Sequence, residues 1–141
     1  MRFERRFEVP KRPTEVLRLI ADFRNLEAWD DSVESVRALD PVFGEGSRYA
    51  VKVRFSGNVI DMDYTVTAYE PGARAVLTGI AAKATAIDII EVEATEHGCR
   101  VDYIAEIQLA FPYRLFDKLL ALQFVKTVDH AVDGLKRFLA A

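Results

Sequence analysis

Alternation of apolar and polar residues runs through most of this 141-residue chain and limits the folds open to it. In the first ten residues, Phe3, Phe7 and Val9 fall on one face and charged residues fall on the other. The same two-residue period returns at 47–55, 58–69 and 99–111, and we expect further strands at 32–40, 73–80 and 84–95. Side chains of a strand alternate between its two faces, so this pattern predicts an antiparallel sheet with one apolar and one wet face.

Helical segments flank this sheet on either side in the sequence. Pro10 and Pro13 end the first strand, and Pro13 suits the first turn of a helix, where no backbone N–H is needed. We expect one short helix around 16–20 and a second at 23–28, capped by Asp22. Residues 113–139 show the period of a single helix that would be roughly 40 Å long. Its predicted buried face consists of Phe116, Leu120, Phe124, Thr127, Val128, Ala131, Leu135 and Phe138.

The order of these segments predicts an α+β fold. A curved seven-stranded antiparallel sheet wraps around the long C-terminal helix, and two short helices follow the first strand. Only one face of the sheet is apolar, so a single helical layer covers it. No repeat or Gly/Ser linker divides the chain, so we expect residues 1–141 to form one domain.

Charge and composition exclude several classes of function. The 22 acidic and 19 basic residues are spread over both halves, which argues against a nucleic-acid-binding surface. The longest stretch without a charged residue, 75–82, is too short to span a membrane, and we expect no membrane insertion. The charged N-terminus is unlike a signal peptide, so we expect a cytoplasmic protein.

Isolated histidines and a single cysteine leave little basis for metal or covalent chemistry. His97 and His130 lie far apart, and Cys99 has no partner with ligand spacing, so we expect neither a metal nor another cofactor. His97 precedes a glycine and is interpreted as a turn residue, His130 as a surface residue and Cys99 as a small buried thiol.

Four segments resemble one known family. They are PTEVLRLIADFRNLEAWDDSVESV at 13–36, GEGSRYAV at 44–51, GCRVDYIAEI at 98–107 and AVDGLKRFL at 131–139. Together the chain resembles the START-like superfamily, also called SRPBCC or Bet v 1-like, and within it the polyketide cyclase/dehydrase and lipid-transport family. Asp31 stands where that family usually has a proline, a variation in a loop. The resemblance implies a helix-grip fold with an apolar cavity between sheet and helix, usually for a small hydrophobic ligand.

The candidates for chemistry are polar residues at alternate strand positions that are otherwise apolar. We call these positions the apolar, or inward, parity. Arg5 shares a face with Phe3 and Phe7, and the resemblance turns Asp88 inward. A buried carboxylate must be paired, neutralised or wet, so Asp88 either pairs with an inward arginine such as Arg5 or meets a ligand. No catalytic residue is assigned, although Asp88 and Tyr103 are candidates. The expected ligand-binding residues are Trp29, Tyr49, Val51, Tyr64, Val66, Asp88, Tyr103, Phe116, Leu120 and Phe124.

Core packing is the competing interpretation for several of these residues. An inward tyrosine can fill the core and bond a backbone carbonyl, or it can present its hydroxyl to a ligand. Trp29 can likewise belong to the core or line the pocket. Alanines on the inward parity, such as Ala86 and Ala105, leave either a void or room for closer packing of helix and sheet.

Three functions remain open at this point. The first is non-enzymatic binding of a small hydrophobic molecule such as a lipid, an isoprenoid or a polyketide-like compound, by a monomer or homodimer. The second, permitted by the resemblance, is an aromatase/cyclase-type enzyme that acts on a ligand in the same cavity, with neither a metal nor a covalent nucleophile. The third is a protein-interaction domain, which would need an exposed apolar patch; the polar outer face of the predicted sheet argues against a large one.

Overall fold

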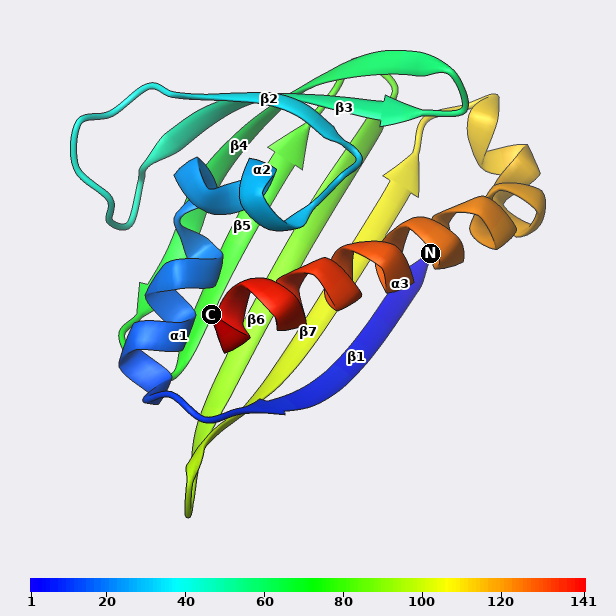
Figure 1. The fold of residues 1–141 in the computed structure, drawn as a ribbon. Helices are drawn as coiled ribbons and strands as arrows, with labels where there is room; N and C mark the ends of the chain where they lie inside the picture. The colour runs from blue at the N-terminus through cyan, green and yellow to red at the C-terminus, as the bar shows by residue number, and fades with distance from the viewer.

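The computed structural model describes residues 1–141 and contains one antiparallel sheet of seven strands in the order β1-β7-β6-β5-β4-β3-β2 (Figure 1). The strands are β1 (Arg2–Val9), β2 (Val33–Ala38), β3 (Arg48–Phe55), β4 (Asn58–Glu70), β5 (Arg74–Ile80), β6 (Ala84–Thr95) and β7 (Gly98–Leu109). The helices are α1 (Pro13–Ala21), α2 (Leu26–Trp29) and α3 (Asp117–Ala140), with 3-10 turns η1 (Phe23–Asn25) and η2 (Tyr113–Phe116). The predicted α+β helix-grip architecture is confirmed.

The two-residue alternation sets the faces of the sheet. Tyr49 pairs with Tyr64 across β3 and β4, and Tyr103 pairs with Arg5 and Ile90 on its two sides. Residues of this parity lie on the concave face, which the helices cover, while the charged residues between them lie on the outer face (Figure 1). The parity predicted for β6 is therefore confirmed, because Ile90 is completely buried.

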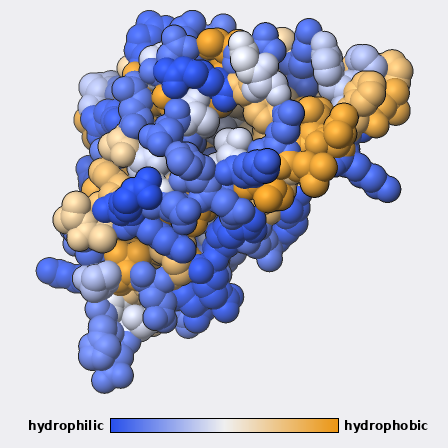
Figure 2. Space-filling model, turned by 45° about the vertical axis from the view of Figure 1, so that its right-hand side comes forward, coloured by the Kyte–Doolittle hydropathy of each residue, from blue (hydrophilic) through white to orange (hydrophobic).

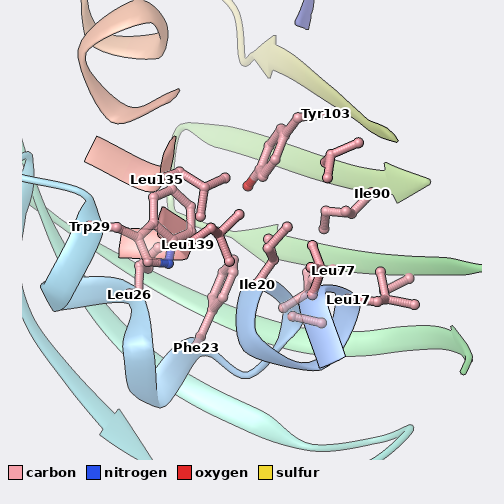
Figure 3. Close-up of a cluster of buried hydrophobic side chains, with 14 of the residues drawn as sticks. Leu17, Ile20, Phe23, Leu26, Trp29, Leu77, Ile90, Tyr103, Leu135 and Leu139 are labelled. Carbon is pink, nitrogen blue, oxygen red and sulfur yellow. The ribbon is translucent and has the colours of Figure 1, made fainter. Parts of the chain in front are cut away.

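One end of the concave face is sealed by α1 and α2. Leu17 and Ile20 of α1 have no exposed surface, and they pack with Leu77, Ile90 and other central-strand residues into the hydrophobic core (Figure 3). Cys99 lies in this core as a free, fully buried thiol, as expected from the sequence. His97 lies in the exposed turn between β6 and β7, also as expected.

The two halves of α3 pack differently. In the C-terminal half, Leu135 and Leu139 are completely buried, and Gly134 lies directly against the backbone of α2. A Cβ at Gly134 would sit 2.1 Å from the carbonyl oxygen of Trp29, so close packing of α3 on α2 requires glycine there. The N-terminal half of α3 has no fully buried residue.

Two expectations about side-chain placement need correction. Phe116 is 55% exposed and does not share the buried face of α3, because η2 and the first turns of the helix project beyond the covered part of the sheet (Figure 1). Arg5 does not pair with Asp88. Its Nε lies 2.6 Å from Asp129 Oδ1 and therefore links the edge strand β1 to α3.

Candidate functional site

The concave face is incompletely covered at the end opposite α1. Side chains there share the inward parity but remain partly exposed, unlike the sealed residues around Leu77. They are Val53, Phe55, Ile60, Ala105, Ile107 and Leu109. We call this region the open end of the concave face. It presents apolar surface that solvent reaches.

Phe124 brings the N-terminal half of α3 against this open end. Its ring stacks on that of Phe55, with centroids 4.2 Å apart and planes 9° apart. Leu120 and Thr127, four residues before and three after, lie on the same side of the helix and are half-buried. The β3–β4 turn adds a hydrogen bond between Ser56 Oγ and Gln123 Oε1 of 2.6 Å. One wall of the open end is thus helical and the other is β-sheet.

Asp88 and Tyr103 form the polar pair of the concave face. They lie on neighbouring strands, β6 and β7, and the Tyr103 hydroxyl donates a hydrogen bond of 2.9 Å to Asp88 Oδ2. Tyr103 is buried, and Figure 3 shows its hydroxyl directed toward Trp29 and Leu135. Ala105, the cross-strand partner of Asp88, is one of the residues of the open end. The pair therefore lies at the boundary between the sealed core and the open end.

The environment of Asp88 favours its protonated form. Loss of water around the carboxyl raises its pKa to about 7, the hydrogen bond from Tyr103 acts against this rise, and the negative charge of Asp30 adds to it. The pKa of Tyr103 is raised well above its ordinary value by burial and by the neighbouring Asp88, so its hydroxyl stays a donor. Near neutral pH the pair can hold or release one proton on Asp88.

Asp30 is a polar residue of this site that sequence reasoning missed. It follows α2 directly, where no two-residue or helical period applies, and its carboxyl accepts hydrogen bonds from the backbone N–H and hydroxyl of Ser32. Burial raises its pKa, and the Ser32 bonds oppose that rise. Its charge acts on Asp88, Tyr64 and Tyr103, so two carboxyl groups influence the concave face.

Trp29 carries an unsatisfied donor. The indole is 4% exposed and lies edge-on to Tyr103, with ring centroids 6.2 Å apart. Its Nε1–H is buried and has no hydrogen-bond partner. A buried donor without an acceptor costs roughly 1–3 kcal/mol. This donor lies among the apolar side chains shown in Figure 3.

The other expected ligand-binding residues divide between the core and the open end. Tyr49 is buried with its hydroxyl 3.0 Å from Asp22 Oδ1, so that hydroxyl already has a partner. Val51 and Val66 are sealed inside the core. Tyr64 is 8% exposed, packs edge-on against Phe23 and has only the Met62 sulfur, 3.9 Å away, as a partner. Leu120 and Phe124 lie at the open end, whereas Phe116 lies outside it.

Other polar features lie away from this site. Two open hollows of about 470 and 360 Å³ lie on the outer face and are lined mostly by charged residues such as Arg2, Glu91 and Arg100, so neither is the apolar cavity that the resemblance implies. His130 is exposed and contacts Asp31 at 2.9 Å. No three His, Cys, Asp or Glu side chains are grouped to hold a metal ion. None of the helices combines the length and the hydropathy that a membrane-spanning segment needs.

Comparison with solved structures finds the same fold in proteins of very different sequence. A Thermus thermophilus protein, TTHA0849, superposes with a TM-score of 0.82 at 17% identity, covering 99% of this chain and 97% of its own. A START superfamily protein from Mycobacterium smegmatis gives a TM-score of 0.78 at 12% identity, covering 98% and 96%. The ZhuI aromatase/cyclase from a Streptomyces species gives 0.79 at 10% identity, covering 99% and 93%. At such low sequence identities, the structural similarity establishes only the fold.

Sequence comparison establishes the family. No curated protein matches the chain significantly. The family described as polyketide cyclase / dehydrase and lipid transport matches residues 1–140, which is nearly the whole chain. Together with the START-like fold, this match shows that the chain belongs to the polyketide cyclase / dehydrase and lipid transport family.

Proposed function

We propose that the chain binds a small hydrophobic molecule at the open end of the concave face, between the central strands and the N-terminal half of α3. The observation that carries this proposal is the partial exposure of inward-facing apolar residues next to a single polar pair, Asp88 and Tyr103. Binding sites for small apolar ligands are concave and mostly apolar, with a few polar groups that fix orientation. The family match supports the same class of function.

The energetics of such binding are sufficient without further polar contacts. An apolar ligand that buried ~200–400 Å² would gain roughly 5–10 kcal/mol at ~25 cal/mol/Å². Loss of translational and rotational freedom offsets a large part of this gain, which leaves an affinity near the micromolar range. Lipid, isoprenoid and polyketide-like compounds all fit this description.

The polar groups favour a ligand that carries at least one hydrogen-bonding group. The Asp88–Tyr103 pair can accept a hydrogen bond at the carboxylate, or donate one when Asp88 is protonated. Ligands with a hydroxyl, carbonyl or carboxyl group at one end are therefore expected to bind more tightly than plain hydrocarbons.

The first experiment identifies the ligand. The purified protein is extracted with organic solvent and the extract is analysed by mass spectrometry. Binding is then measured with that compound and with three probes: oleate, farnesol and an anthraquinone. Trp29 is the only tryptophan of the chain, so its fluorescence reports binding beside Tyr103.

A matched pair of variants locates the site. Ala105→Phe places a ring at the open end, while Ala50→Phe places the same ring on the outer face of β3. We expect Ala105→Phe to weaken binding at least about tenfold, because overpacking removes the space for the ligand. Ala50→Phe should bind like the wild type. Equal binding by both variants would refute the location.

A second candidate function is a cyclase that acts on a ligand in the same site. It is favoured by the raised pKa of Asp88, about 7, because an acid that titrates near neutral pH can both give and accept a proton. Cyclisation of a linear poly-β-ketone thioester, followed by absorbance and mass spectrometry, tests this function. Loss of turnover with retained binding in Asp88→Asn and Tyr103→Phe would support it. Unchanged turnover in both variants would exclude those catalytic roles.

A further inference from the structure

Exposed apolar side chains cluster just before η2, on η2 and on the first turns of α3. Phe111, Leu115, Phe116, Leu119 and Leu122 are each more than half exposed, at 68%, 68%, 55%, 66% and 67%. Figure 2 shows hydrophobic side chains gathered on the right-hand side of the molecule, the side on which this segment lies in Figure 1. We call these five residues the apolar face of 111–122. The polar outer face of the sheet had argued against a large exposed apolar patch. The structure shows one elsewhere, on this segment.

This segment of α3 is apolar on two opposite sides. Leu120 and Phe124 turn toward the sheet, whereas Leu119 and Leu122 point away from it into solvent. A helix with apolar side chains all round is normally buried. Contiguous apolar surface of this kind marks a contact site for a protein or a membrane.

Positive charges surround the apolar face of 111–122. Lys83, Arg114, Lys118 and Lys126 are all exposed, and Asp117 is the only acidic residue between 107 and 128. The Lys83 ammonium lies 5.0 Å from the ring centre of Tyr113 and hydrogen-bonds its hydroxyl. This region is therefore locally cationic in a chain whose net charge is −3.

We propose that the apolar face of 111–122 docks on the surface of an anionic lipid bilayer. The arrangement matches an interfacial helix, with leucine and phenylalanine entering the headgroup region and lysine and arginine contacting anionic lipids. Pairing of two copies through this face would bring the same cations together, and that repulsion disfavours a homodimer. The docking is peripheral and places no helix across the membrane, which agrees with the structure.

Docking on this face would also place the first turns of α3, which form the helical wall of the open end, against the bilayer. Phe124, which stacks on Phe55 at the open end, is only two residues from Leu122. The docking proposal depends only on the exposed apolar residues and the cations around them. It does not depend on the proposed ligand site.

Vesicle co-sedimentation tests the proposal with the full chain. We expect binding to vesicles of phosphatidylcholine mixed with phosphatidylglycerol, and much weaker binding to phosphatidylcholine alone. Leu119→Ser combined with Leu122→Ser should reduce binding at least about tenfold, since the apolar contribution is lost. Val42→Ser, at another exposed apolar position (73%), is the matched control and should bind normally.

A charge variant tests the electrostatic part. Lys118→Gln combined with Lys126→Gln should weaken binding to the mixed vesicles about 25-fold, since each cation near an anionic surface contributes roughly a factor of five. The control, Arg12→Gln with Arg37→Gln, removes the same charge at exposed positions elsewhere and should bind normally.

Three results would overturn the proposal. The first is no binding to the mixed vesicles, and the second is equal binding to vesicles with and without phosphatidylglycerol. The third is a wild-type dimer in analytical ultracentrifugation that becomes monomeric in the Leu119→Ser, Leu122→Ser variant, which would assign the face to a second copy. Ligand binding is measured separately, through Trp29 fluorescence. A failure of vesicle docking would therefore leave the proposed ligand site untouched, and the reverse also holds.

Discussion

Replacing Asp88 by asparagine should make the protein more stable, and more so at high pH. Asparagine keeps a side-chain oxygen that can accept the 2.9 Å hydrogen bond from Tyr103, but it carries no charge. In the wild type the folded protein holds the Asp88 proton more tightly than the unfolded chain does, because burial raises the pKa from 3.8 to about 7. The wild-type free energy of unfolding therefore falls as the pH rises from about 4 to about 7, and this effect levels off above pH 7.

The size of this effect follows from the pKa difference. A shift of roughly three units at ~1.4 kcal/mol each gives an upper limit of about 4 kcal/mol for the full titration. Between pH 5 and pH 8 the same titration predicts a change of about 2.5 kcal/mol, because the unfolded carboxyl is already mostly ionised at pH 5. Asp88 is only half-buried, and solvent screening lowers the expected change to about 1–2.5 kcal/mol.

Urea unfolding of the wild type and of Asp88→Asn at pH 5 and pH 8 measures this difference. Subtracting one protein from the other cancels the contributions of titrating groups that do not interact with Asp88. Asp63→Asn, which removes an exposed aspartate from the outer face of β4, is the matched control for an Asp-to-Asn change on the solvent side of the sheet. If Asp88→Asn gains no more at pH 8 than at pH 5, the pKa of Asp88 is not raised in the folded protein.

Two further variants test the packing of the sealed end. Gly134→Ala should lower the free energy of unfolding by about 2–3 kcal/mol, because its Cβ would meet the Trp29 carbonyl oxygen at 2.1 Å; Gly44→Ala, which has open space, should be nearly neutral in the same urea titration. Tyr49→Phe should cost about 2 kcal/mol, because the buried Asp22 carboxylate loses its tyrosine donor, and an unchanged unfolding midpoint would contradict that role.

The sequence was sufficient to predict the fold because strand periodicity acts locally. Each strand alternates strictly enough that the buried parity of β3, β4 and β7 can be read from residues such as Tyr49, Tyr64 and Tyr103. In β6 the alternation is ambiguous, because Ile87 and Ile89 flank Asp88, and it was the family resemblance that directed Asp88 to the concave face. A polar residue on an apolar parity was thus the signal that led to the polar pair.

Features that depend on tertiary geometry could not be predicted in this way. Helical periodicity identifies a face of α3 but not how far the sheet extends beneath it, so Phe116 was expected inside and lies outside. The partner of Arg5 depends on where Asp129 of α3 passes the edge strand, a contact 124 residues apart in the chain. Asp30 lies in an irregular segment, where no period marks the direction of its side chain.

The indole N–H resonance of Trp29 offers the most direct test of ligand binding beside the Asp88–Tyr103 pair. Because the chain has one tryptophan, a ¹H–¹⁵N correlation spectrum contains a single indole cross-peak from a donor that has no partner in the free protein. We predict that the compound extracted from the protein, or the best of the three probes, shifts this peak saturably in the wild type and in Ala50→Phe but not in Ala105→Phe. If mass spectrometry shows that a ligand is bound while the Trp29 peak does not move, the ligand does not bind beside the Asp88–Tyr103 pair.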